Sequence, residues 1–289
     1  MIHMRKFLAF VALATMVPAI TARAGKYVTD SLSSKVLGAV VKYNVYLPDG
    51  FDKSDGLYPV VYLLHGLTDD YRAWRDKGRM DMVADELMRS GEARKMVIVM
   101  PNAGGPDTKN TWNGYFNMPG WNYEDFFFTE FMPAVEKKYR CISDKGHRAV
   151  MGLSMGGGGS TVYCQKHPEC FSSCYAMSAW LDNDASKIDS DKDENYRLYC
   201  VCKAVHDNAA PEFVLNADEK TREELRTVKW FFDCGDDDFL LDVNVKMHQA
   251  MRDSGIKDEL RIRNGVHNWE YWHLALRMAL PFASRNFDN

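Results

Sequence analysis

The sequence predicts a single α/β domain in which a mostly parallel central sheet is flanked by helices. Apolar strand-like runs alternate with helix-like runs along the chain, as a parallel sheet requires. No internal repeat, low-complexity linker or domain boundary interrupts this alternation. The domain is expected to cover residues 25–289, because residues 1–24 have the features of a leader. Removing 24 of the 289 residues leaves 265, which is enough for one large domain.

The individual elements follow from the spacing of apolar side chains. Residues 39–47 alternate, which predicts an early strand that pairs antiparallel. Residues 122–139 place apolar side chains on one side of a long amphipathic helix. The other predicted strands are short apolar runs, and they cover residues 59–64, 96–100, 147–151, 174–177, 228–232 and 259–263. The other predicted helices cover residues 80–88, 160–164, 242–254 and 269–278.

The first 24 residues have the three parts of a secretory signal peptide. Met1–Lys6 is short and basic, Phe7–Ile20 is apolar, and Ala22-Arg23-Ala24 matches an A-x-A cleavage site. The apolar run is interrupted by Pro18 and is too short to span a bilayer, so an uncleaved membrane anchor is the minor alternative. We therefore expect a secreted or periplasmic protein, without stable membrane insertion, whose mature chain begins at Gly25.

Charge and cysteine content bear on partners and metals. The net charge is −4 and no basic patch with interleaved aromatic residues occurs, so no nucleic-acid partner is expected. Residues 164–174 space three cysteines and one histidine in a pattern that superficially resembles a zinc site. Because this stretch runs from a predicted helix into a strand, regular packing explains it better, and we expect no metal. Seven cysteines are an odd number, so at least one stays free or pairs between chains, and a disulfide among the others stays open.

Residues 152–156, Gly-Leu-Ser-Met-Gly, form a G-x-S-x-G pattern centred on Ser154. The pattern lies between a predicted strand and a helix-compatible segment, which is the setting of a nucleophile held at a sharp turn. Gly152 and Gly156 would let the strand and the helix approach each other without a side-chain clash. Since a serine hydroxyl is a poor nucleophile unless a base lies beside it, Ser154 is a candidate nucleophile. The alternative is a glycine-rich connection with an incidental serine.

The candidate acid and base follow Ser154 in the order aspartate, then histidine. One strand-like run leads into the acidic turn 233–239, and a later one leads to His267. Each candidate lies just past the carboxyl end of a predicted strand, where ligands bind in open α/β sheets. His267 follows Asn-Gly in a loop, which argues against a buried packing role. An ordinary polar loop histidine is the alternative.

Three consecutive aspartates, residues 236–238, could serve His267, and spacing alone does not choose among them. Phe239 directly follows the third and is expected to act as a hydrophobic anchor that fixes its orientation. We therefore predict that Asp238 orients the histidine, and that the other two carboxylates are mainly solvated.

A fourth element lies upstream, at His65-Gly66. The buried strand over residues 59–64 ends there, which suits the loop that donates one amide of an oxyanion hole. Gly66 would let the backbone turn toward the site, and the N–H of Leu67 would be the donor. The second donor would be the N–H of Met155, directly after the nucleophile. The alternative is a simple exit from the strand into a loop.

Together these segments resemble those of the Putative esterase family of α/β-hydrolases, which includes esterase D (S-formylglutathione hydrolase), feruloyl and acetyl-xylan esterases, and the mycolyltransferases. The matching segments are spread over nearly the whole chain beyond the leader, and they are residues 63–68, 152–157, 234–239 and 265–272. The resemblance implies the α/β-hydrolase fold and ester chemistry, and it places the family's acid on Asp238. It does not fix the substrate.

The irregular stretch 103–121 is a candidate for substrate contacts. It carries Trp112, Trp121 and two further aromatic residues among glycines and asparagines. Exposed aromatic side chains on such a loop would suit a sugar ring or an aromatic acyl group. The alternative is a small satellite core beneath a long loop. Trp269, two residues beyond His267, is the third candidate contact.

The sequence therefore predicts an exported serine carboxylesterase that acts on a small-molecule or oligosaccharide ester, with feruloyl or acetyl groups on plant polysaccharide fragments as the leading substrates. His267 would take the proton of Ser154, and Asp238 would orient the imidazole. No metal or organic cofactor is required. The alternatives are an S-formylglutathione hydrolase-like thioesterase, an acyltransferase, and a catalytically silent carbohydrate-binding module of the same fold. The oligomeric state stays open.

Overall fold

The structure is a computed structural model, and it describes residues 24–184, 192 and 194–288. Residues 1–23 of the expected signal peptide lie outside the described residues. No helix in the described part of the chain is long and apolar enough to cross a bilayer.

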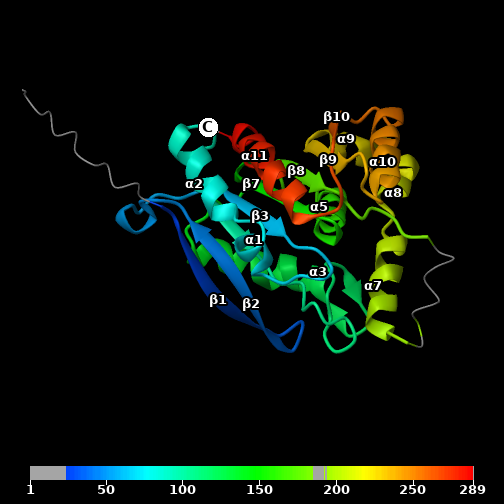
Figure 1. Cartoon of the computed structure of the whole chain (residues 1–289), viewed down its shortest axis with the longest axis horizontal. Helices are drawn as coiled ribbons and strands as arrows, with labels where there is room; N and C mark the ends of the chain where they lie inside the picture. Colours follow the sequence, from blue (N-terminus) through cyan, green and yellow to red (C-terminus); the bar gives the residue numbers. More distant parts are fainter. Residues whose placement is uncertain (1–23, 185–191, 193, 289) are drawn as a thin grey trace, which may run out of the picture.

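The described strands build one eight-stranded sheet, supplemented by a separate two-stranded hairpin (Figure 1). The strands of the large sheet are β1 (Lys26–Ser34), β2 (Ala39–Leu47), β3 (Val60–Leu64), β4 (Val97–Met100), β7 (Arg148–Leu153), β8 (Ser173–Met177), β9 (Lys229–Gly235) and β10 (Asp258–Arg263). The hairpin pairs β5 (Asn117–Met118) with β6 (Trp121–Asn122).

The large sheet has the order β1-β2-β4-β3-β7-β8-β9-β10. β2 runs antiparallel to both β1 and β4, whereas the neighbours from β4 to β10 are parallel. The predicted α/β class, the mostly parallel sheet and the antiparallel strand over residues 39–47 are confirmed. Because β3, β7, β8, β9 and β10 point the same way, the loops that follow them emerge at one edge of the sheet.

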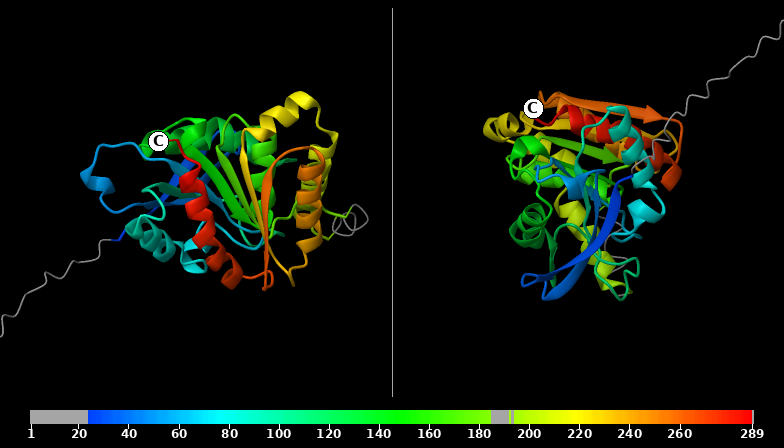
Figure 2. Two further views of the ribbon diagram at one scale, coloured as in Figure 1. Left: turned by 90° about the horizontal axis from the view of Figure 1, so that it is seen from above. Right: turned by 90° about the vertical axis from the view of Figure 1, so that its left-hand side faces the viewer.

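Helices cover both faces of the sheet (Figure 2). The described helical segments are α1 (Ala73–Asp76), α2 (Met80–Ser90), α3 (Tyr123–Phe126), α4 (Met132–Lys138), α5 (Met155–Lys166), α7 (Tyr196–Asp207), α8 (Ala210–Asn216), α9 (Glu219–Arg226), α10 (Leu241–Asp253) and α11 (Trp269–Arg285), with short 3₁₀ turns at Phe51–Lys53 and Lys145–His147. Side chains of β3 alternate between two buried clusters. Val61 and Leu63 join the cluster of α2 and α11, and Val60 and Tyr62 join that of α3, α4 and α5.

The helix expected over residues 122–139 contains a π-helical turn. Phe127–Phe131 is π-helical and joins α3 to α4. The buried stripe Phe127, Phe131, Val135 and Tyr139 has a spacing of four residues. In a straight α-helix this spacing drifts by about 40° per step, since 3.6 residues make one turn. The wider π turn offsets part of that drift and keeps the aromatic stripe against the sheet.

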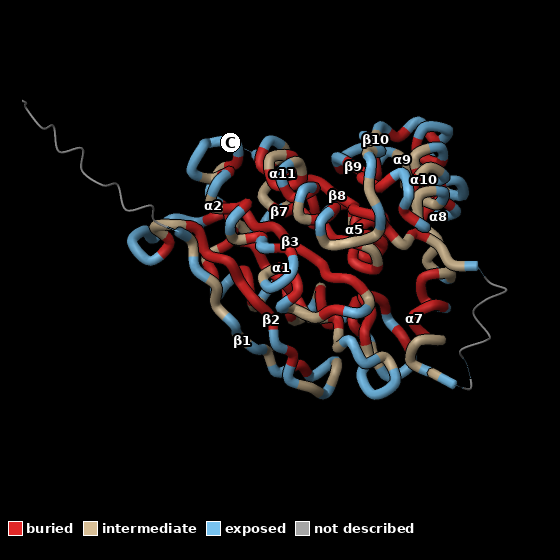
Figure 3. Tube along the Cα trace, viewed as in Figure 1, coloured by how far each residue is buried: buried red, intermediate tan, exposed pale blue. Residues whose placement is uncertain are grey.

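β1 was not predicted, and its burial pattern explains why. Its residues are mostly exposed or half-buried, in contrast to the fully buried strands at the centre (Figure 3). β1 pairs with β2 along the whole length of both strands. Main-chain pairing thus defines this edge strand, and its side chains carry little of the apolar alternation that marks a strand in a sequence.

Candidate active site

Ser154 lies at a strained turn between β7 and α5. Its φ of 53° and ψ of −119° are unusual for a residue with a side chain. The flanking glycines make this turn possible. A Cβ on Gly152 would lie 2.5 Å from the carbonyl oxygen of Gly156, and a Cβ on Gly156 would lie 2.6 Å from that of Leu64. Strand and helix therefore approach as the G-x-S-x-G pattern required, and the turn holds the serine at the carboxyl edge of the sheet.

The loops after β9 and β10 bring two titratable side chains to Ser154. His267 Nε2 lies 3.0 Å from Ser154 Oγ. On the other side of the ring, His267 Nδ1 lies 2.9 Å from Asp238 Oδ2. Asp236 and Asp237 are exposed, as expected for solvated carboxylates. The three side chains form one hydrogen-bonded chain from a buried carboxylate to a serine hydroxyl, the arrangement that activates a nucleophile.

The Asp238 carboxylate is held as an anion. Its burial alone would raise its pKa, but the hydrogen bonds from His267, the Leu240 N–H and the Ser178 hydroxyl outweigh that effect, and the pKa is lowered. The Leu240 N–H donates to Asp238 Oδ1 at 2.9 Å. An ionised carboxylate accepts only, so the histidine nitrogen that faces it must carry a proton. The nitrogen that faces Ser154 is then free to accept one.

Ser178 and Trp272 support this arrangement, and the sequence patterns did not reveal them. Ser178 is fully buried after β8, in the left-handed region at φ 45°. The Trp272 indole N–H donates to Ser178 Oγ at 3.0 Å. Since the indole nitrogen only donates, the serine proton is free to point to Asp238. The Trp272 ring also packs edge-on against the ring of His267, with centroids 4.9 Å apart.

The loop after β3 carries Leu67, which lines the cavity beside Ser154. Among the described residues, neither the Leu67 N–H nor the Met155 N–H has a hydrogen-bond acceptor. The Met155 N–H lies at the N-terminus of α5, where the helix dipole favours negative charge. A Cβ on Gly66 would lie 2.8 Å from Leu153 Cδ1, so glycine lets this loop pack against Leu153 without a shift of that side chain. Both N–H groups are therefore without an acceptor, as the donors of an oxyanion hole would be before substrate binds.

Buried side chains form hydrogen bonds with the main chain of the loop that contains Leu67. The Ala103 N–H donates to His65 Nε2 at 3.1 Å, and His65 Nδ1 lies 2.9 Å from the Gly66 oxygen. Burial lowers the pKa of His65, in keeping with a neutral, structural ring. The amide of Asn113 donates to the oxygen of Leu67 and, at 3.2 Å, to that of Asp69. We infer that the direction of the Leu67 N–H is fixed by residues that do not themselves face the serine.

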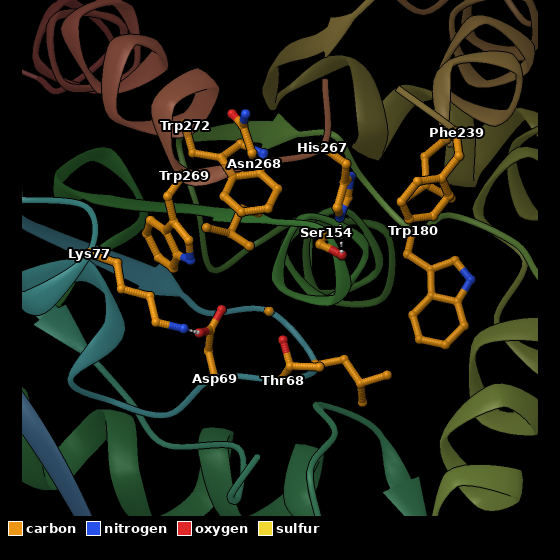
Figure 4. Close-up of a pocket in the computed structure, with 14 residues that line it drawn as sticks. Thr68, Asp69, Lys77, Ser154, Trp180, Phe239, His267, Asn268, Trp269 and Trp272 are labelled. Atoms are coloured by element: carbon orange, nitrogen blue, oxygen red, sulfur yellow. Dashed lines mark hydrogen bonds and ion pairs between the residues drawn. The ribbon is translucent and has the colours of Figure 1, made fainter. Parts of the chain in front are cut away.

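A cavity of about 510 Å³ opens beside Ser154. It is lined by Gly66, Leu67, Thr68, Asp69, Lys77, Leu153, Ser154, Trp180, Phe239, Leu240, His267, Asn268, Trp269 and Trp272. Figure 4 shows Trp269, Asp69 and Lys77 on one side of the serine, and Trp180 and Phe239 on the other. The serine thus lies between two groups of lining side chains.

Comparison with known proteins identifies the family of this chain. Residues 34–283 match the family described as Putative esterase. The chain belongs to this family. A solved ferulic acid esterase is 48% identical to it, with a TM-score of 0.87 over 92% of this chain and 100% of the other. The protein has the α/β-hydrolase fold and is a carboxylic ester hydrolase.

Two curated relatives match one part of this esterase. The endo-1,4-beta-xylanase/feruloyl esterase of Xylanibacter ruminicola is 31% identical over 142 residues, which are 48% of this chain and 19% of that enzyme. Esterase Rv1288 of Mycobacterium tuberculosis is 33% identical over 137 residues, 47% of this chain and 28% of the relative. The match therefore spans less than a third of either relative's length.

The three tryptophans that were predicted to contact the substrate do not all line the same cavity. Trp269 lines the cavity beside Ser154, whereas Trp112 and Trp121 lie outside its lining and border a separate hollow. The other aromatics of their loop, Tyr115 and Phe116, are buried and join the main core. That loop is thus part core and part surface.

Phe239 does not anchor the acidic turn, so that expectation is wrong. Its side chain is 76% exposed, and its ring lies 4.4 Å from the ring of His267. The turn is fixed instead by polar contacts, since the Asp236 carboxylate accepts from the Gly265 N–H at 2.9 Å. Phe239 forms a wall of the cavity that a substrate would meet.

Six of the seven cysteines are free thiols, namely Cys141, Cys164, Cys170, Cys174, Cys200 and Cys234. Cys164 is buried in α5 and Cys174 is buried in β8, in keeping with a packing role for this stretch. Among the described residues, no group of three side chains is arranged to hold a metal ion.

Proposed function

We propose that the protein is a serine esterase that removes feruloyl groups from carbohydrate esters. The hydrogen-bonded chain Ser154–His267–Asp238, which borders a cavity lined by aromatic side chains, carries this proposal. Ser154 Oγ attacks the ester carbonyl while His267 Nε2 takes its proton, and Asp238 stabilises the imidazolium. The N–H groups of Leu67 and Met155 receive the oxyanion.

The acyl-enzyme then forms and breaks in a balanced sequence. The imidazolium of His267 gives its proton to the leaving alcohol oxygen as the ester bond breaks, which leaves the acyl group on Ser154. A water molecule next loses a proton to His267 and attacks the acyl carbonyl. The proton returns to Ser154 Oγ as the acid departs, which restores the starting state.

The side of the cavity with Trp269 favours an aromatic acyl group over acetyl. There the indole rings of Trp269 and Trp272 pack edge to face against each other, with centroids 5.3 Å apart, and both line the cavity. The same side holds an ion pair, with Lys77 Nζ 2.7 Å from Asp69 Oδ1. An acetyl group would leave this space unfilled, whereas a hydroxyaryl group would fill it and bring its hydroxyl to the ion pair. The names of the relatives support the same substrate class.

A substrate panel tests the proposal. Methyl ferulate, a feruloylated oligosaccharide, an acetylated oligosaccharide and S-formylglutathione are compared by kcat/KM. We expect the two ferulate esters to exceed the acetyl ester by roughly tenfold or more, since a hydrophobic pocket gains about 1–3 kcal/mol from groups that fill it. Preference for S-formylglutathione would instead indicate a thioesterase. Ester exchange onto added sugar in place of acid release would indicate an acyltransferase.

We also propose that the protein is exported and cleaved before Gly25. The contacts of Gly25 support this site. Its N–H donates to Asp85 Oδ1 at 2.7 Å, and the Tyr46 hydroxyl donates to the same oxygen at 2.6 Å. A Cβ at Gly25 would lie 2.4 Å from the Tyr46 ring, so a larger residue there would require the Tyr46 side chain to shift. Cleavage would convert this N–H into an ammonium group that pairs with the Asp85 carboxylate.

The expected result is a mature chain that starts at Gly25. Protein recovered from the outside or the periplasm of its native host is analysed by N-terminal sequencing and intact mass. An intact Met1 end on active protein would contradict export by cleavage.

A further inference from the structure

A second hollow borders the loop after β3, which also lines the cavity beside Ser154. It has a volume of about 420 Å³ and is lined by Asp70, Asn102, Gly104, Gly105, Thr111, Trp112 and Trp121. Asp69 lines the cavity of Ser154, and the next residue, Asp70, lines this hollow. One short loop therefore separates the two spaces, and a substrate that extends beyond its ester could contact both.

The walls of this hollow are held in place without a ligand. The Gly105 N–H donates to the Trp112 oxygen at 3.0 Å, and Asn113 Nδ2 donates to the Gly105 oxygen at 3.1 Å. The Trp121 ring stacks on Tyr123, with centroids 6.0 Å apart and planes 25° from parallel. Preformed walls reduce the ordering cost of binding.

The chemistry of the hollow suits a neutral polyol. The partly exposed indole rings of Trp112 and Trp121 line it, together with the Asn102 amide and the Thr111 hydroxyl. Asp70 is the charged residue in the lining, and Arg72 pairs with both of its carboxylate oxygens, so the hollow presents no unpaired charge to a ligand. The Trp121 indole N–H is covered and has no acceptor among the described residues. Aromatic faces with amide, hydroxyl and carboxylate groups match the apolar faces and hydroxyls of a sugar ring.

We propose that the hollow between Trp112 and Trp121 binds a neutral sugar unit of the oligosaccharide whose ester lies at Ser154. This inference rests on the proposed function, because it takes the alcohol part of the substrate to be a carbohydrate. It gives the two tryptophans a role in affinity for long substrates and none in bond cleavage.

Chain-length dependence tests the proposal. KM and kcat are measured for Trp112→Ala and Trp121→Ala on methyl ferulate and on feruloylated oligosaccharides with an increasing number of sugars. We expect KM for the longer oligosaccharides to rise roughly fivefold to thirtyfold, as loss of an aromatic contact of about 1–2 kcal/mol would give. KM for methyl ferulate and kcat for all substrates should stay within about twofold of the unaltered enzyme. Phe213→Ala, a partly exposed aromatic on α8, is the matched control and should change neither.

Two results would overturn the proposal. An unchanged KM for every chain length would show that the tryptophans do not touch the sugar. An equal rise in KM for methyl ferulate and for the oligosaccharides would show that the two tryptophans only support the fold of the loop after β3.

A binding experiment distinguishes failure of the sugar site from failure of the proposed function. Ser154→Ala protein is titrated with an unesterified arabinoxylan oligosaccharide by calorimetry, with and without Trp121→Ala. Binding that Trp121→Ala weakens supports the sugar site even if no ferulate ester is cleaved. If neither protein shows a heat of binding, the sugar site is refuted.

Discussion

Ser154→Ala is expected to lower turnover by about 10⁴ to 10⁶-fold. The substitution removes the atom that lies 3.0 Å from His267 Nε2, and no other side-chain oxygen in the cavity takes its place in that hydrogen bond. The fold should persist, because the strained backbone at this position already carries a Cβ. Turnover of a chromogenic ester, with circular dichroism as the check of folding, measures the change.

A covalent probe makes the same point independently of turnover. An organophosphonate that mimics the tetrahedral intermediate should add once per chain, at Ser154, and should fail to add to the alanine variant. Near-normal esterase activity in Ser154→Ala, or labelling elsewhere, would contradict the role of this serine.

Asp238→Asn is expected to lower turnover by about 10³ to 10⁴-fold while leaving the fold intact. The carboxylate now accepts hydrogen bonds from His267 and from the Leu240 N–H. An amide can turn an N–H toward the imidazole and favour the tautomer whose proton faces Ser154, so the ring can no longer accept the serine proton.

Asp237→Asn is the matched control for this prediction. Asp237 is adjacent in sequence and exposed, so its loss of charge should cost less than about tenfold in turnover. If Asp237→Asn were crippling and Asp238→Asn mild, the carboxylate that serves His267 would have been assigned one residue too late.

The sequence was sufficient to predict features that depend on local pattern. A serine between two glycines, directly after a buried strand, predicts a tight strand-to-helix turn, and Ser154 lies in one. The loops with Asp238 and His267 could be placed at one sheet edge because parallel strands share a direction. Asp238 was chosen from three adjacent aspartates on the resemblance to a known family and on anchoring by Phe239. The anchoring was wrong, and the structure has Asp238 against the histidine.

Features that depend on partners from distant segments could not be predicted. Phe239 is apolar, and only its position relative to His267 shows that it faces the cavity and solvent. Ser178 and Trp272 are 94 residues apart and belong to no recognisable motif, yet their hydrogen bond lies behind the Asp238 carboxylate. The edge strand β1 has mostly polar side chains, and its partner strand alone reveals it.

The amide of Asn113 has a consequence for changing the specificity of this esterase. One side chain donates to Leu67, in the loop of the expected oxyanion donor, and to Gly105, in the loop with the two tryptophans. Exchange of residues 103–121 for a loop from another protein would therefore alter the aim of a main-chain N–H beside Ser154. Loop replacement, by design or in evolution, is constrained here, and a graft that retains Asn113 has the better prospect of a new substrate range without loss of rate.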